Sequence, residues 1–247
     1  MLRLNVDRPS PPPSPPHPRP ARASLLSLIA TLAGLLWAFA ELAEKVRAGG
    51  TQSFDERFLL AFRNTSNLAD PIGPPWVEEM ARDFTALGGI GVLAFLTVAL
   101  ALLLAFQGKL RTVALLAASV LGGLTLSSLI KHAIERPRPA LVPHGSLIYT
   151  SSFPSGHSTM AAVTYLTLGA LLMRTDRRPL VKLYLLSLAV ILTVLVGVSR
   201  VYLGVHWPTD VLAGWTLGAA WAIVCWLAAR WLQRKGQVEP PTADTLP

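Results

Sequence analysis

The stretch LYLLSLAVILTVLVGVSRVYLGVHWPTD, residues 183–210, predicts both the surroundings and the chemistry of this protein. Residues 183–199 carry no charged side chain and are largely apolar, and their number is close to the roughly 20 residues that cross the hydrocarbon core of a bilayer. Arg200, His206 and Asp210 follow directly. The stretch therefore predicts a membrane-spanning helix that ends in a cluster of groups able to bind an anion.

The same pattern recurs along the chain. Further uncharged, largely apolar runs cover residues 23–40, 84–108, 112–130, 158–173 and 211–229. A composition of 52% hydrophobic and 15% charged residues, with a mean hydropathy of +0.47, is too apolar for an ordinary soluble domain. We therefore expect an all-α, polytopic membrane protein in which six transmembrane helices form one bundle.

The basic residues stand at the ends of the predicted spans. With a cytoplasmic N-terminus, the cytoplasmic segments hold more than half of the 22 Lys and Arg residues, as the positive-inside rule requires. Three of the others, Lys131, Arg138 and Arg200, lie in clusters on the outer side. Both termini are predicted to be cytoplasmic. The net charge of +8 does not form one stripe on a soluble face, so no nucleic-acid partner is expected.

The membrane domain is expected to cover residues 24–235. Residues 1–23, rich in proline, and residues 236–247 are predicted to be disordered tails, the first of them cytoplasmic. The first apolar run, which ends in Ala38-Phe39-Ala40, also resembles a signal peptide with its cleavage site, but the stretch before it is long for such a signal and favours an uncleaved helix. Cys225 is the only cysteine, which excludes an intramolecular disulfide and a cysteine metal cage.

One long connection, residues 45–83, lies on the predicted outer side. The spacing of Phe54, Phe58 and Phe62 predicts a short interfacial helix, and Trp76 and the apolar residues after it predict a second. Prolines between residues 71 and 75 separate the two. Packing against the bundle or against lipid headgroups is favoured over the alternative of a lid that gates the substrate.

The predicted topology brings four span ends to the outer surface. They are the end of the third span, the start of the fourth, the end of the fifth and the start of the sixth. The side chains expected to converge there are three cations, two imidazoles and one carboxylate: Lys131, Arg138, Arg200, His157, His206 and Asp210. This combination suits a phosphate ester or anhydride presented at the membrane edge.

Each cluster has a chemical use. Lys131, Arg138 and Arg200 supply charge-assisted donors to phosphoryl oxygens. Ser155 and Gly156 open the fourth span, where free backbone N–H groups and the helix dipole favour an anion.

The third cluster suggests a nucleophile. His206 and Asp210 are four residues apart, so that a helix or helix-like turn near Pro208 would place them on one side. The carboxylate can then hold the tautomer of the imidazole and leave its other nitrogen free to attack phosphorus.

Taken singly, these residues also have structural explanations. Lys131 and Arg138 could anchor the chain at lipid headgroups, and Arg200 could neutralise a helix C-terminus. A lone histidine near an interface is more often structural than catalytic. Their occurrence together at one surface favours a site. The neighbouring Arg136 is expected to contact a headgroup or to support the site from behind, and Trp207 to belong to the interfacial aromatic belt.

Three motifs resemble those of the type 2 phosphatidic acid phosphatase (PAP2) superfamily of integral-membrane lipid phosphatases. A lysine, six residues and Arg-Pro occupy residues 131–139, and PSGH occupies residues 154–157. Ser-Arg, five residues, a histidine, three residues and an aspartate occupy residues 199–210. The resemblance covers most of the chain, without the tails, and implies a six-helix bundle with a PAP2/haloperoxidase-like core.

The resemblance implies a metal-independent, cofactor-free hydrolysis in two steps through phosphohistidine. His206 attacks phosphorus and Asp210 orients it. His157 protonates the leaving oxygen and then assists water. The residues implied to hold the phosphoryl group are Lys131, Arg138, Ser155, Arg200 and the backbone of Gly156.

The sequence leaves the substrate open among undecaprenyl diphosphate, phosphatidylglycerol phosphate, phosphatidic acid and diacylglycerol diphosphate, with a weak preference for the first or for a broad range of lipid phosphates. The expected partners are a lipid phosphate and membrane lipids, met on a periplasmic or extracellular face, and no oligomeric state is predicted. Two alternatives are a lipid phosphotransferase that uses the same site and a noncatalytic lipid-binding or transport protein. The second is disfavoured because the ionisable residues gather at span ends and not at mid-membrane.

Overall fold

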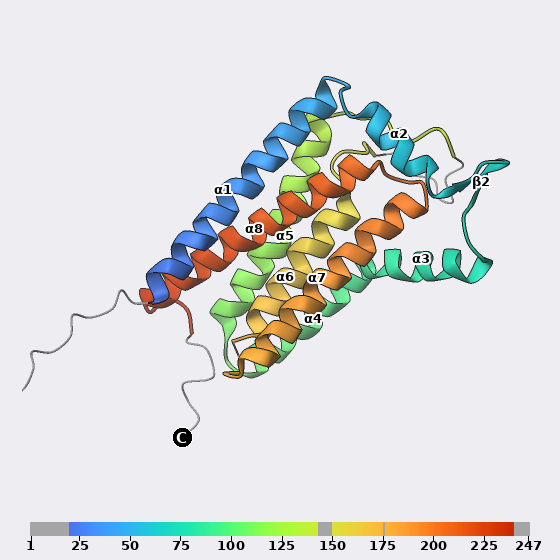
Figure 1. The fold of residues 1–247 in the computed structure, drawn as a ribbon. Coiled ribbons are helices and arrows are strands. Elements are labelled where there is room, and N and C mark those ends of the chain that lie inside the picture. Colours follow the sequence, from blue (N-terminus) through green and yellow to red (C-terminus); the bar gives the residue numbers. More distant parts are fainter. Residues whose placement is uncertain (1–19, 143–149, 175, 240–247) are drawn as a thin grey trace, which may run out of the picture.

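The computed structural model describes residues 20–142, 150–174 and 176–239 (Figure 1). Within these residues the chain forms eight α-helices and one antiparallel two-stranded hairpin. The helices are α1 (Pro20–Arg47), α2 (Gln52–Leu60), α3 (Pro75–Leu87), α4 (Ile90–Phe106), α5 (Leu110–Ala133), α6 (Gly156–Leu172), α7 (Pro179–Tyr202) and α8 (Pro208–Arg234), and the strands are β1 (Arg63–Asn64) and β2 (Asn67–Pro71).

The predicted all-α character is confirmed, and each of the six apolar runs falls mainly within one long helix. In the described chain, α1, α5, α7 and α8 are long and apolar enough to cross a membrane, and α3 with α4 would make a fifth crossing bent by 46°. Helix α6 has 17 residues and lies in the interior of the bundle. The number of six crossings stays a prediction.

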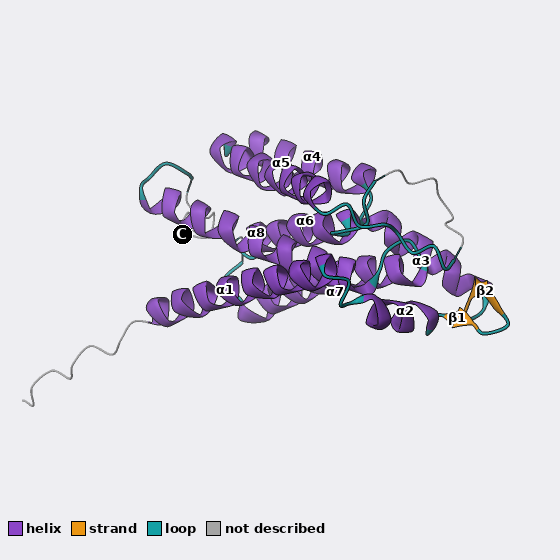
Figure 2. Ribbon diagram, turned by 90° about the horizontal axis from the view of Figure 1, so that it is seen from above, coloured by secondary structure: helices purple, strands orange, loops and turns teal. Residues whose placement is uncertain are grey.

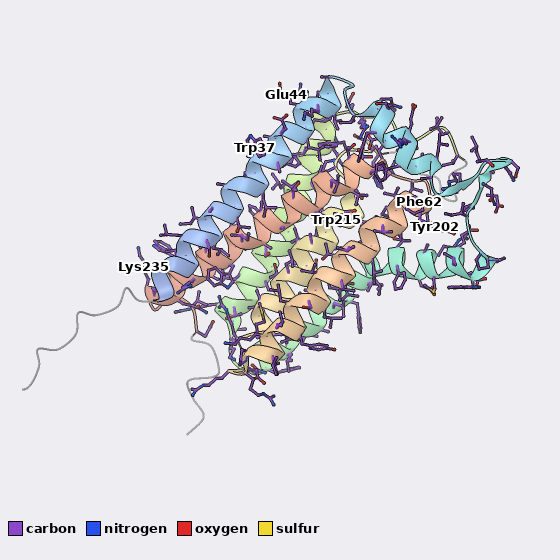
Figure 3. The ribbon with its side chains drawn as sticks, viewed as in Figure 1. Trp37, Glu44, Phe62, Tyr202, Trp215 and Lys235 are labelled. Carbon is purple, nitrogen blue, oxygen red and sulfur yellow. The ribbon has the colours of Figure 1, made fainter. Side chains whose placement is uncertain are left out.

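Helix α6 is the centre of the bundle. It packs against α4, α5, α7 and α8, while α1 lies along the outside of α8 (Figures 1 and 2). Apolar side chains on the outer helices point away from the bundle, as Trp37 does in Figure 3. The exposed fraction of Trp37 is 70%. Exposed apolar surface spread over several helices is typical of a lipid-facing surface.

Close backbone contact joins α6 to α8. A Cβ added at Gly214 would lie 2.8 Å from the Cβ of Ser158, and one added at Gly218 would lie 2.6 Å from the backbone oxygen of Thr159. Small residues four apart allow this approach in membrane bundles. The packing brings the start of α6 against the start of α8, and both of these helix starts carry predicted site residues.

Figure 1 shows the start of α1 and the end of α8 at one end of the bundle, together with the α4–α5 and α6–α7 connections. Residues 236–239, expected in the C-terminal tail, are ordered at this end. Glu239 accepts the backbone N–H groups of Arg111 at 3.0 Å and Thr112 at 3.1 Å, because the first turn of α5 leaves these donors free. Residues 20–23 of the predicted N-terminal tail are helical, and the rest of both predicted tails, 1–19 and 240–247, lies outside the described residues.

The other end carries the long connection, in which both expected short helices occur as α2 and α3. Between them lies the β1–β2 hairpin, which the sequence did not suggest. The buried guanidinium of Arg63 donates to the carbonyl oxygen of Tyr202 at 2.8 Å and so joins the hairpin to the end of α7. The first span is also part of this end, since Phe39 on α1 packs against Phe153 with ring centroids 6.0 Å apart.

Replacing Gly218 by Ala should lower the midpoint of thermal denaturation in detergent. The new Cβ would collide with backbone, so a helix must shift at a cost of about 1–3 kcal/mol. The matched control is Gly34→Ala on α1, where no atom lies within 4 Å and Ala, the better helix former, should leave the midpoint unchanged or raise it. Equal midpoints for the two variants would contradict close α6–α8 packing.

Candidate active site

The three clusters predicted from the sequence lie at the same end of the bundle. Lys131 ends α5, His157 begins α6, Arg200 is in the last turn of α7, and His206 and Asp210 stand at the start of α8. The three cations interact electrostatically with His157, and both Lys131 and Arg200 interact with Arg138. The convergence expected from the order of the spans is therefore present.

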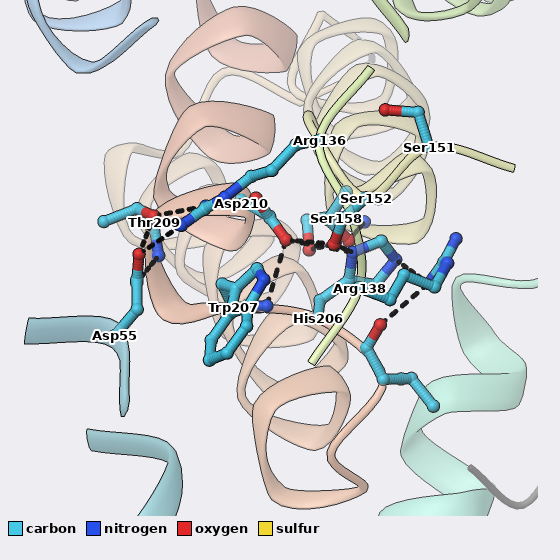
Figure 4. A network of polar contacts seen from close by, with 12 residues as sticks. Asp55, Arg136, Arg138, Ser151, Ser152, Ser158, His206, Trp207, Thr209 and Asp210 are labelled. Atoms are coloured by element: carbon cyan, nitrogen blue, oxygen red, sulfur yellow. Dashed lines mark hydrogen bonds and ion pairs between the residues drawn. The ribbon is translucent and has the colours of Figure 1, made fainter. Parts of the chain in front are cut away.

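His206 and Asp210 form a buried pair. Their side chains are 2% and 0% exposed, and Nδ1 of His206 lies 3.5 Å from Oδ2 of Asp210. The hydroxyl of Ser152 lies between them, 3.3 Å from the same Nδ1 and in a short hydrogen bond to the carboxylate (Figure 4). The backbone N–H of Trp207 donates to Oδ2 at 3.0 Å, which fixes the carboxylate in the first turn of α8.

The contacts of His206 define its tautomer. Nη1 of Arg138 lies 3.1 Å from Nε2 (Figure 4), and because a guanidinium only donates, Nε2 must accept. The proton of the neutral ring is then on Nδ1, toward Asp210 and Ser152. Burial and the charge of Arg138 lower the pKa of His206 to about 3, against the raising effect of Asp210. The ring is therefore neutral at neutral pH, with a lone pair on Nε2.

Backbone oxygens and hydroxyls orient the three cations. Nζ of Lys131 donates to the carbonyl of Ser151 at 2.7 Å, and Arg138 donates to the carbonyls of Val205 at 2.7 Å and Thr150 at 3.0 Å. In the described part of the chain, none of the three cations forms an ion pair with a carboxylate. Their combined positive charge is available to an anion.

Among the described residues, Arg200 has one hydrogen-bond donor without an acceptor. Its Nη1 donates to the hydroxyl of Thr85 on α3 at 2.9 Å, whereas its buried Nε has no hydrogen-bond partner among the described residues. A buried donor without a partner costs free energy, and a phosphoryl oxygen would supply the missing acceptor. The contact with Thr85 could not be predicted from the sequence, because Thr85 lies 115 residues from Arg200 along the chain.

At the start of α6, Ser155 also has a structural role that the sequence did not indicate. The hydroxyl oxygen of Ser155 is fully buried and accepts the backbone N–H of Ser158 at 3.4 Å, so that it caps α6. Its donation to a phosphate stays a prediction. At Gly156 a Cβ would lie 3.6 Å from Cε of Lys131, which places the backbone of this turn beside the ammonium group.

His157 lies beside the bend between α3 and α4. A Cβ added at Gly88 would lie 3.3 Å from the Cβ of His157 and 2.4 Å from Cγ1 of Val196, so that only glycine admits this close approach. No hydrogen bond to the His157 ring occurs within residues 20–142, 150–174 and 176–239. The ring is therefore free to exchange a proton with a bound molecule.

Arg136 is not a headgroup contact. Its side chain is 8% exposed and forms ion pairs with two carboxylates, Asp55 at 2.6 Å and Asp210 at 2.7 Å. It therefore supports the site from behind, which was the other expectation for this residue. Asp55 was missed, although its position four residues before the buried Leu59 places it on the inward face of α2. Trp207 is 4% exposed and lies under Arg136 and not in an aromatic belt.

An open depression of about 430 Å³ adjoins the site. It lies between the end of α1, the start of α2 and the loop after α5, with Arg47, Arg138, Leu141 and Trp207 among its lining residues. Among the described residues, no three His, Cys, Asp or Glu side chains lie together as a metal site would require. The metal-independent hydrolysis stays a prediction.

Comparisons with known proteins agree with this geometry. The sequence profile of the PAP2 superfamily matches residues 111–234, which include all three motifs. Phosphatidylglycerophosphatase B of Bacillus subtilis (strain 168) is 37% identical over 186 residues, or 73% of this chain and 85% of that protein. Undecaprenyl-diphosphatase of Sulfolobus acidocaldarius is 32% identical over 124 residues, or 48% of this chain and 56% of that protein.

A solved structure extends the similarity to the fold. The crystal structure of the transmembrane PAP2-type phosphatidylglycerolphosphate phosphatase from Bacillus subtilis matches with a TM-score of 0.73 and 29% sequence identity. The match covers 83% of this chain and 98% of that one. Because the profile, the relative and the fold agree, this chain belongs to the PAP2 superfamily and is a phosphatase of the PAP2 type.

Proposed function

We propose that this protein hydrolyses a lipid phosphate or diphosphate through a phosphohistidine on His206, without a metal. The observation that carries the proposal is the contact between Nε2 of His206 and Arg138 at 3.1 Å, within a group of cations for which the described residues provide no carboxylate partner. A neutral imidazole supplies the nucleophile, and the cations stabilise the charge that develops on the phosphoryl oxygens.

In the first step Nε2 of His206 attacks the terminal phosphorus as its bond to the leaving oxygen breaks, which is the ester oxygen of a lipid monophosphate or the bridging oxygen of a lipid diphosphate. Arg138 moves from Nε2 to a phosphoryl oxygen. The negative charge of the bound phosphate favours the protonated form of His157, which gives its proton to the leaving oxygen. The proton on Nδ1 stays between His206 and Asp210, whose negative charge stabilises the cation that forms.

In the second step neutral His157 takes a proton from water, and the water oxygen attacks phosphorus. The bond between phosphorus and Nε2 breaks, which returns the electron pair to His206 and releases inorganic phosphate. Lys131, Arg200 and the backbone of Gly156 hold the phosphoryl oxygens in both steps.

We further propose that six helices cross the membrane, with cytoplasmic termini and an outward site. The support is the arrangement of the bundle. The helix ends that carry Lys109, Arg111, Arg178 and Arg234 lie opposite the site, and basic residues favour the cytoplasmic side. The substrate would then be presented on the outer leaflet.

For the substrate we propose phosphatidylglycerophosphate first and undecaprenyl diphosphate second. Two of the relatives are named for these molecules, and the relative named for the first matches over 85% of its length, well beyond the PAP2 profile. Both molecules carry a terminal phosphate that a single histidine can reach at the membrane edge.

Replacing His206 by Ala should abolish phosphate release from lipid mono- and diphosphates by the purified protein in detergent with EDTA. Loss of a covalent nucleophile is expected to lower kcat by about 10³-fold or more. The matched control is the variant His132→Ala. His132 is exposed at the end of α5, and its Nδ1 lies 2.7 Å from the carbonyl oxygen of Ser128 in its own helix. This variant should retain wild-type activity.

Each failure in this experiment has a different meaning. Full activity in His206→Ala would refute the phosphohistidine. Loss of wild-type activity with EDTA would refute the metal-free reaction. Transfer of the labelled phosphoryl group to an added lipid, in place of release to water, would identify the protein as a phosphotransferase.

The neutral state of His206 should also appear in acid stability. Its pKa is about 3 when folded and near 6.5 when unfolded, so between these values the unfolded chain binds the extra proton and the free energy of unfolding falls as pH falls. At about pH 5 the loss is on the order of 2 kcal/mol. Between about pH 7.5 and about pH 5, the denaturation midpoint of the wild type should fall further than that of His206→Gln. Equal falls would mean that His206 is not held neutral.

A further inference from the structure

A buried ion-pair network lies behind the nucleophile and reaches outside the part of the chain that the PAP2 profile matches. Asp55 on α2 is 0% exposed and accepts from Nη2 of Arg136 at 2.6 Å. Nη1 of the same arginine donates to Oδ1 of Asp210 at 2.7 Å. Figure 4 shows Arg136 between the two carboxylates. A single guanidinium therefore joins α2 to the carboxylate that orients His206.

Asp55 also binds the first turn of α8 directly. Its Oδ1 accepts the backbone N–H of Thr209 at 2.9 Å, and its Oδ2 accepts the Thr209 hydroxyl at 2.7 Å. These bonds satisfy a free donor at the start of a helix. Asp55 thus holds Thr209, the residue directly before Asp210. Leu59, one helical turn after Asp55, belongs to the same buried apolar cluster as Trp207.

The charges of this network do not cancel. Two carboxylates and one guanidinium leave one net negative charge, buried from water beside a neutral His206. If Asp55 carried no charge, Arg136 would neutralise Asp210 alone, and little negative charge would remain to stabilise the cation that forms on His206. In a buried site such a difference is large, because charges interact strongly at low dielectric constant.

We propose that Asp55 and Arg136 are positioning residues for the reaction. Because Arg136 also pairs with Asp55, it neutralises the Asp210 carboxylate only in part. Arg136 also holds that carboxylate beside Nδ1 of His206. The inference rests on the proposed function, because it requires a positive charge to form on His206. On this proposal α2, which lies outside the residues that the PAP2 profile matches (111–234), contributes a residue that supports catalysis.

The alternative is a purely structural ion pair. In that case removing one partner would lower stability by leaving a buried charge unpaired, removing both would lower it less, and kcat of the folded protein would stay near the wild-type value in every variant. The charge argument instead predicts changes in kcat. Asp55→Asn leaves a net charge of zero, Arg136→Gln leaves two negative charges, and the double variant restores one negative charge.

The test is a double-mutant cycle on purified full-length protein with EDTA, with kcat and KM measured on phosphatidylglycerophosphate and undecaprenyl diphosphate. Asp55→Asn keeps an oxygen that can accept the Thr209 N–H and removes only the charge. It should lower kcat by about 10-fold to 100-fold, the range seen for residues that orient a reacting group from behind, with KM changed by less than about threefold. The double variant should have a higher kcat than either single variant.

A matched control is Glu78→Gln on α3. Its carboxylate is also 2.6 Å from an arginine, Arg82, but the pair is exposed on the surface, so kcat and KM should match the wild type. Denaturation midpoints of all variants separate loss of fold from loss of rate. If Arg136→Gln does not fold, Asp55→Asn alone decides.

Wild-type kcat in Asp55→Asn, or a double variant less active than both single variants, would overturn the inference. These outcomes differ from failure of the proposed function. That failure would appear as His206→Ala retaining activity, or as no phosphate release by the wild type, whatever the Asp55 variants do.

Discussion

The buried carboxylate of Asp210 is the interaction on which the site depends. It accepts the N–H of Trp207 at 3.0 Å and an ion pair from Arg136 at 2.7 Å, and it shares the Ser152 hydroxyl with His206. A buried charge is stable only when it is paired and hydrogen-bonded. The partners of Asp210 come from the loop after α5, the loop before α6 and the start of α8, and Arg136 links them to the start of α2.

The positive charges of the site, on Lys131, Arg138 and Arg200, are held differently from the negative charge of Asp210. Among the residues that the structure describes, the cations that face His157 are oriented by carbonyls and hydroxyls and not by carboxylates, which keeps their charge uncancelled. Such an arrangement is unfavourable by itself and becomes favourable when an anion binds. The repulsion is tolerated because α5 and α7, which carry Lys131 and Arg200, both pack on α6, and α6 is held against α8 by close contact at Gly214 and Gly218.

Much of this could be read from the chain without coordinates. The apolar runs place six long helices because a backbone in lipid must satisfy its own hydrogen bonds, and the order of the runs brings the motif residues to one end. Arg136 and Asp55 show the limit. Arg136 stood within a basic motif, yet its two carboxylate partners lie 81 and 74 residues away along the chain, so no local pattern distinguishes a buried ion pair from a headgroup contact. Ser155 was predicted as a donor to phosphate, and its cap on α6 appeared only with the helix start in place.

The sequence by itself determined the class of the protein, its helices and the chemistry of its clusters, because hydrophobic length and the protonation chemistry of side chains are local properties. Only the tertiary structure decided which nitrogen of His206 carries the proton, that Arg200 keeps a buried Nε without a partner among the described residues, and that α2 contributes Asp55 to the site. Those features depend on distances between segments far apart in the chain, and packing sets such distances where local sequence does not.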